Sequence, residues 1–235
     1  MWLCLLTAVP LRADELALEL PRSAFCLVGQ AVTVTVANRM SMVEGQYELK
    51  YVARLDQIPP VDTVAFEIPV FAPKDLDRLE DLAEITQIKL RVGNAAFDPA
   101  DCEPLSDAGH TLGMVPGDTR VMVFTFRLPR AVLQKRFTLR VTYFQPHYRF
   151  GGQEVSAYLP LLPDFEDMKN ELLFSRDDFT VDFEAVGSVR LRRLTTNDAV
   201  AAETPRVIKV HPVHREIIAV VVQAVAPAQT AAPPP

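Results

Sequence analysis

Apolar and polar residues alternate along most of the chain with a period of two, which is the pattern of a β-strand with one dry and one wet face. The segment Val32–Val36 shows it clearly, because threonines separate its three valines. The segment Phe137–Phe144 repeats it with the β-branched and aromatic residues that strands prefer. We predict further strands at Leu16–Leu20, Tyr47–Ala53, Thr63–Phe71, Ile88–Val92, Val121–Leu128, Val155–Leu159, Phe179–Ala185, Val189–Leu194, Val207–Val210 and Ile217–Val222.

A helical period is confined to two short segments. Lys74–Ile85 has apolar residues on one face and acids on the other, and Asp164–Phe174 begins with a capping aspartate. So many short strands favour an all-β sandwich or barrel over a layered α/β fold. We expect an immunoglobulin-like β-sandwich with two short covering helices. The 19 prolines fit this class, since we expect Pro69, Pro129 and Pro146 at strand ends, where a missing N–H does no harm.

The two ends of the chain differ from its middle. Residues Met1–Ala13 contain the apolar run Trp2–Val9, which is too short to span a bilayer, and the segment ends in a small residue before two acids. This resembles a secretory signal peptide without its basic start, which a truncated gene start would explain; a hydrophobic N-terminal strand is the alternative. We expect one mainly-β domain over residues 14–225, with a subdomain boundary near Pro163 as the alternative, and a disordered Ala/Pro tail over residues 226–235.

Composition and charge restrict the classes of function. The chain has 235 residues, 49% of them hydrophobic, and a formal net charge of −6. It has no excess of cations to neutralise a phosphate backbone, so we expect no nucleic-acid partner. The rest of the chain also has no apolar stretch long enough for a membrane span, and Ile217–Val222 is typical of a buried strand. Together with the signal-like start, these features predict an exported protein, periplasmic or extracellular, whose partner is a protein or a glycan.

The cysteines suggest a covalent link. If cleavage follows Ala13, two cysteines remain, Cys26 and Cys102. An even pair in an exported protein predicts one disulfide. Closing a loop of that size would stabilise the fold by roughly 4 kcal/mol in the chain-entropy model. Two separate thiols are the alternative, because connectivity does not follow from sequence.

No enzyme motif is present: there is no nucleophile elbow, P-loop, dinucleotide-binding glycine pattern or His-Glu-x-x-His. His211 and His214 form the only close histidine pair, but positions three apart on a strand point to opposite faces, and structural zinc needs four ligands. One loop gathers four acids of the kind that calcium prefers, although their spacing matches no EF-hand. These acids are Asp98, Asp101, Glu103 and Asp107. We therefore predict no metal site and no cofactor.

Aromatic residues crowd the segment Tyr143–Phe150 at the end of a predicted strand. If exposed, Tyr143, His147, Tyr148 and Phe150 would form a platform for a sugar or an extended peptide. The alternative is that alternate aromatics fill the core while the others cover a loop. The glycine pair that follows, residues 151–152, predicts a hairpin turn.

These features favour a non-catalytic binding or structural module. A carbohydrate-recognition module that uses the aromatic turn is one alternative. A second alternative is a hydrolase with scattered active-site residues, because catalytic triads assemble from distant positions. The candidates for such a site are His147, Asp164 and either His211 or His214. The sequence predicts no defined catalytic residue.

Overall fold

The computed structural model describes residues 25–51, 63–76, 78–105, 119–132, 136–160, 178–195, 199–212 and 217–225. These residues form fifteen strands and one short α-helix, so the all-β prediction is confirmed. The strands are β1 (Phe25–Val36), β2 (Met40–Tyr51), β3 (Thr63–Pro73), β4 (Lys89–Val92), β5 (Ala95–Phe97), β6 (Asp101–Pro104), β7 (Thr119–Pro129), β8 (Arg136–Pro146), β9 (Tyr148–Phe150), β10 (Gln153–Tyr158), β11 (Phe179–Ala185), β12 (Val189–Arg193), β13 (Ala199–Glu203), β14 (Val207–His211) and β15 (Ile218–Ala224). The helix is α1 (Leu79–Thr86), and a 3-10 turn covers Arg130–Val132.

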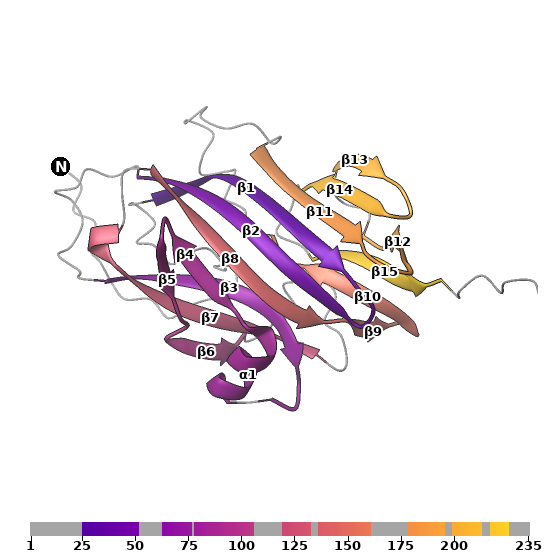
Figure 1. Ribbon diagram of the computed structural model, residues 1–235, viewed down its shortest axis with the longest axis horizontal. Helices are drawn as coiled ribbons and strands as arrows, with labels where there is room; N and C mark the ends of the chain where they lie inside the picture. The colour runs from indigo at the N-terminus through magenta and orange to yellow at the C-terminus, as the bar shows by residue number, and fades with distance from the viewer. Residues whose placement is uncertain are drawn as a thin grey trace, which may run out of the picture.

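The strands form three sheets (Figure 1). Sheet A has eight strands in the order β13-β14-β11-β1-β2-β8-β4-β5, of which β1 and β11 are parallel and the other neighbours antiparallel. Sheet B has the order β3-β7-β6, and sheet C has the order β12-β15-β10-β9. This three-sheet arrangement is sandwich-like, but it does not establish the immunoglobulin-like type.

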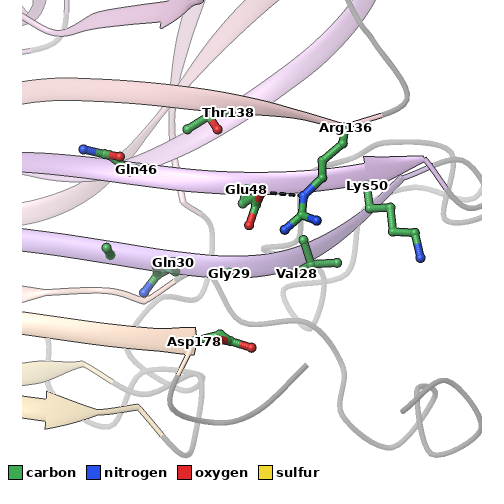
Figure 2. Close-up of a pocket in the computed structure, with 10 residues that line it drawn as sticks. Val28, Gly29, Gln30, Gln46, Glu48, Lys50, Arg136, Thr138 and Asp178 are labelled. Atoms are coloured by element: carbon green, nitrogen blue, oxygen red, sulfur yellow. Dashed lines mark hydrogen bonds and ion pairs between the residues drawn. The ribbon is translucent and has the colours of Figure 1, made fainter. Parts of the chain in front are cut away.

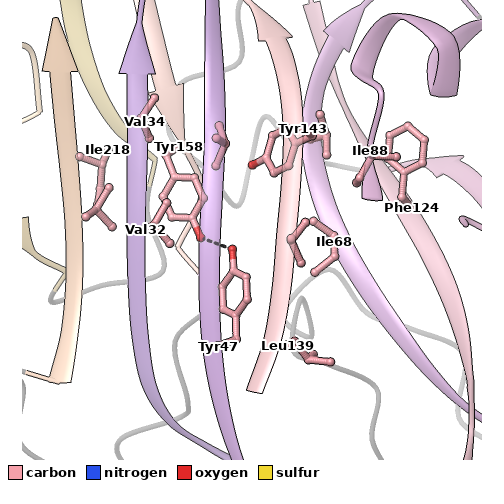
Figure 3. Close-up of a cluster of buried hydrophobic side chains, with 14 of the residues drawn as sticks. Val32, Val34, Tyr47, Ile68, Ile88, Phe124, Leu139, Tyr143, Tyr158 and Ile218 are labelled. Carbon is pink, nitrogen blue, oxygen red and sulfur yellow. Dashed lines mark hydrogen bonds between the residues drawn. The ribbon is translucent and has the colours of Figure 1, made fainter. Parts of the chain in front are cut away.

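The main core lies between sheet A on one side and sheets B and C on the other. Val34, Val141 and Phe183 point inward from sheet A and are fully buried. They belong to one apolar cluster with Phe124 of sheet B and Ile218 of sheet C, part of which is drawn in Figure 3. A second, smaller cluster joins sheets B and C, so each sheet packs on both others.

The other face of sheet A is open to solvent, because its central strands alternate between buried and exposed residues. In β8, Leu139 and Val141 are buried, whereas Arg140 and Thr142 are exposed. The neighbouring strands continue this pattern in register, so their threonines and charged residues share one outer surface, which we call the open face. It comprises Ala31, Thr33, Thr35, Glu44, Gln46, Glu48, Lys50, Lys89, Arg91, Arg136, Thr138, Arg140, Thr142, Thr180, Asp182, Glu184 and Lys209.

Helix α1 overlaps the predicted segment Lys74–Ile85 but begins only at Leu79, after a turn, and ends one residue later, at Thr86. Its Leu82 is fully buried, and the helix packs against β8. The second predicted helix, Asp164–Phe174, lies outside the described residues. So do the predicted strand at residues 16–20, the signal-like segment, the alternative boundary near residue 163 and the C-terminal tail.

Pro69 departs from the prediction that prolines mark strand ends. It lies in the middle of β3, opposite Val123 of β7. Because β3 is an edge strand of sheet B, a residue without an N–H is tolerated there. Pro129 and Pro146 are the last residues of β7 and β8, as predicted.

Candidate functional site

The aromatic segment that follows β8 is mostly turned inward. Tyr143 is 2% exposed and Tyr148 is 1% exposed. The Tyr148 ring stacks on Phe71 with 5.9 Å between the ring centroids. Phe150, by contrast, is 40% exposed. The predicted aromatic platform is therefore not formed as a whole, because buried rings cannot offer their faces to a sugar; the alternative, in which the aromatics alternate between core and surface, describes the segment better.

The glycine pair after this segment forms the predicted hairpin turn. Gly151 and Gly152 have φ angles of +57° and +77°, which suit glycine, and Phe150 lies opposite Gln153 across the turn. The hairpin folds β10 back along β9. It thereby brings Glu154 beside His147, seven residues earlier in the chain.

A polar cluster forms around His147. Its Nε2 lies 2.9 Å from the Ser41 Oγ, and its Nδ1 lies 2.8 Å from the Glu154 Oε1. The Ser41 Oγ is in turn 2.7 Å from the Ser156 Oγ. Ser41 comes from β2, Glu154 and Ser156 come from β10, and His147 lies between β8 and β9. We call these four residues the polar cluster.

Simple rules of donors and acceptors assign the protons of this cluster. A carboxylate only accepts, so the His147 Nδ1–H donates to Glu154, and in the neutral ring Nε2 accepts from the Ser41 hydroxyl. The Ser156 hydroxyl then donates to Ser41. Burial lowers the pKa of His147, and the hydrogen bond to Glu154 opposes this shift in part. Lowering of this pKa favours the neutral ring that the hydrogen-bond pattern requires.

This connectivity is that of a serine-histidine-acid triad, but a substrate could not reach the serine. Ser41 is 0% exposed, and the side chain of His147 is 2% exposed. A catalytic serine must hydrogen-bond to its base and must also reach the carbonyl carbon of a substrate. In this conformation the hydrogen bonds of the polar cluster instead connect β2 of sheet A to β10 of sheet C.

A second buried hydrogen bond joins the same two strands. The hydroxyl groups of Tyr47 in β2 and Tyr158 in β10 are 2.8 Å apart, and both rings are buried (Figure 3). Burial raises the pKa of Tyr47 to about 12, against a smaller opposing effect of the hydrogen bond from Tyr158. Both phenols therefore stay neutral near pH 7.

The remaining candidate residues that the structure describes are not brought together into one site. The His211 Nδ1 is satisfied by the Phe179 carbonyl at 3.0 Å, while His214 and Asp164 lie outside the described residues. The Asp101 carboxylate accepts the N–H of Cys102 at 2.8 Å, and Asp107 lies outside the described residues. In the part of the chain that the structure describes, no group of three metal-ligating side chains occurs. The same part contains no helix long and apolar enough to cross a bilayer.

Cys102 lies half-buried in β6 of sheet B and forms no disulfide with another described side chain. Burial and the nearby Asp101 carboxylate raise its pKa to about 11. Cys26 lies in β1 of sheet A, and its side chain is outside the described part of the structure. The Cys26–Cys102 bridge therefore stays a prediction.

A groove of about 700 Å³ crosses one end of the open face (Figure 2). The Glu48 carboxylate of β2 and the Arg136 guanidinium of β8 meet in it at 2.5 Å. This pairing lowers the pKa of Glu48 and raises that of Arg136. In Figure 2 Lys50 extends away from the pair. The groove is lined by Val28, Gly29, Gln30, Ala31, Gln46, Glu48, Lys50, Arg136, Thr138 and Asp178.

Solved structures resemble this chain only at a low level. Leukotriene A4 hydrolase from Saccharomyces cerevisiae has a TM-score of 0.43 at 10% identity and covers 91% of this chain. Aminopeptidase A from Legionella pneumophila, in complex with aspartic acid, has a TM-score of 0.33 at 7% identity over 85% of this chain. An M1 zinc metallopeptidase from Deinococcus radiodurans has a TM-score of 0.32 at 12% identity, also over 85%.

This chain spans 32%, 21% and 42% of the lengths of those three proteins, in the same order. Likeness at this level assigns neither a detailed fold nor a function. No known family and no curated protein matches the chain in sequence.

Sequence reasoning pointed to His147 but missed its partners Ser41 and Glu154. A signal for Ser41 does exist in the sequence. In β2 it occupies the same phase as Val43 and Tyr47, which are buried, so it is a polar residue at a dry position. No comparable signal identifies Glu154, because only the hairpin turn brings it to the histidine.

Proposed function

We propose that this chain is a non-catalytic binding or structural module that contacts its partner through the open face of sheet A. The groove on that face carries the proposal, because it is accessible and lined by polar and charged groups. In the arrangement most like an active site, by contrast, Ser41 is fully buried and the side chain of His147 is only 2% exposed. The signal-like residues Met1–Ala13 support a site of action outside the cytoplasm.

The character of the open face also supports binding. Ala31, Gln46 and Thr142 are exposed at its centre, and the sheet beneath them is held by the core. Residues that stand on paired strands keep fixed positions, which reduces the entropy lost when a partner docks.

Cross-linking can test this proposal. A photo-reactive phenylalanine analogue is placed at Gln46 on the open face or, as a control, at Arg127, which is exposed on β7 of sheet B. In the native compartment we expect a specific adduct from Gln46 and none from Arg127. Absence of an adduct from Gln46, with or without adducts from Arg127, would overturn the proposal.

A hydrolase is the second candidate, and the Ser41–His147–Glu154 connectivity is the observation in its favour. It requires an opening that exposes Ser41. A fluorophosphonate probe tests this on the folded protein, with Ser41→Ala as the matched control. Our proposal predicts no labelling at Ser41, whereas labelling that Ser41→Ala abolishes without unfolding the protein would establish the hydrolase.

A further inference from the structure

Three cations stand together on the open face where β4 lies beside β8. Arg91 is directly opposite Arg140 in the register of the two strands, and Lys89 is opposite Thr142. All three side chains belong to exposed residues. None of them forms an ion pair with another described residue. We call Lys89, Arg91 and Arg140 the basic patch.

The basic patch differs from the rest of the same face, where carboxylates pair with the cations. Lys50 is also opposite a cation, Arg136, but there Arg136 forms an ion pair with Glu48. Lys209 lies opposite Asp182 in register, with 3.0 Å between the Nζ and Oδ2 atoms. Like charges directly opposite each other destabilise a sheet. The chain as a whole has a net charge of −6, so the local surplus of cations runs against its overall balance. Folding alone therefore does not account for the Arg91–Arg140 pair, and an anion bound between them would remove the repulsion.

A cavity of about 620 Å³ opens beside the basic patch. Arg140 lines it together with the apolar residues Val92, Val132 and Phe137. Thr138 lines both this cavity and the groove described above, so the two hollows adjoin. An anionic group at Arg140 would thus have beside it a hollow with apolar residues in its wall.

We propose that the basic patch docks an acidic segment of a partner polypeptide, with carboxylates on Arg91 and Arg140 and a neighbouring apolar side chain in the cavity. This rests on the proposed function of the open face. A guanidinium suits a carboxylate because two parallel N–H···O bonds form. A nucleic acid fits less well, since Glu44 lies opposite Thr142 next to Lys89 and three cations neutralise little of a long phosphate backbone.

Fluorescence anisotropy with a defined probe tests the proposal on the full chain. The probe is a labelled peptide of alternating glutamate and leucine, compared with a glutamine-leucine peptide of equal length. The variant Arg91→Gln/Arg140→Gln is matched by Arg127→Gln/Arg190→Gln, which removes the same charge from exposed positions on β7 and β12. Circular dichroism confirms that both variants fold.

We expect the acidic peptide to bind the wild type and the matched control alike, and binding to weaken with salt. Loss of the charge-assisted bonds should lower affinity in Arg91→Gln/Arg140→Gln about tenfold or more. No binding to the wild type, equal loss in both variants, or tighter binding of a DNA oligonucleotide or of phosphatidylserine vesicles would overturn the proposal.

The Gln46 cross-link separates this failure from failure of the proposed function. An adduct that persists unchanged in Arg91→Gln/Arg140→Gln refutes the basic patch but leaves the open face as the binding surface. Absence of the adduct in the wild type refutes the binding surface itself.

Discussion

Replacing Tyr47 with phenylalanine removes one hydroxyl from a hydrogen-bonded pair between sheets A and C. The ring stays, so no cavity forms, but the Tyr158 hydroxyl loses the partner that now lies 2.8 Å away. Leaving a buried hydroxyl unsatisfied costs about 1–3 kcal/mol. We therefore expect Tyr47→Phe to lower the free energy of unfolding by about 2 kcal/mol. In a domain of this size, that corresponds to a fall in Tm of about 4–8 °C.

The double variant Tyr47→Phe/Tyr158→Phe completes the test, because it removes both polar atoms. We expect it to be more stable than the sum of the single effects predicts, by about 1 kcal/mol or more. Urea unfolding followed by circular dichroism is the suitable assay, since the single tryptophan, Trp2, lies in the signal-like segment. Single effects that add within about 0.3–0.5 kcal/mol would refute the coupling of the two hydroxyls.

Three further predictions concern single residues. A Cβ at Gly45 would lie 2.6 Å from the Tyr47 hydroxyl, so we expect Gly45→Ala to destabilise by about 1–3 kcal/mol in the same assay, whereas Gly29→Ala, whose Cβ meets nothing closer than 3.5 Å, should be tolerated. Burial lowers the pKa of His147 below 6.5, so the unfolded chain takes up this proton first and stability is lost as pH falls below 6.5; His147→Gln should flatten this part of the stability profile, and an unchanged slope would contradict the reasoning. The Cys102 thiol, with its pKa of about 11, should react slowly with iodoacetamide at pH 8 and faster as pH rises, while no reaction without reductant would indicate the bridge instead.

The long strands could be predicted because burial on one face imposes the alternation that the sequence displays. The predicted segment Phe137–Phe144 became β8, which extends it by one or two residues at each end. Strands β5, β6 and β9 were missed because three or four residues are too short to establish a period. Strand β13 was missed because all its residues are exposed, so no apolar phase marks it.

The pairing of the strands could not be predicted from the sequence. Val121–Leu128 and Phe137–Phe144 look alike and are close in the chain, yet β7 pairs with β3 and β6, while β8 pairs with β2 and β4. The same limit hid the polar cluster. Ser41 meets His147 across 106 positions, because β2 pairs with β8, the strand that His147 follows. Alternation reports which face a residue occupies, but not which residue it faces.

Lysine acylation tests the central claim, that the open face of sheet A binds a partner, most directly. The protein is labelled both in its native compartment and after purification, and the labelling of each lysine is compared. Lys89 lies exposed on the open face, whereas Lys74 is exposed in the turn after β3. We predict that Lys89 is protected in the native compartment and that Lys74 is not. Equal labelling of Lys89 in both preparations, or protection of Lys74 alone, would contradict the account.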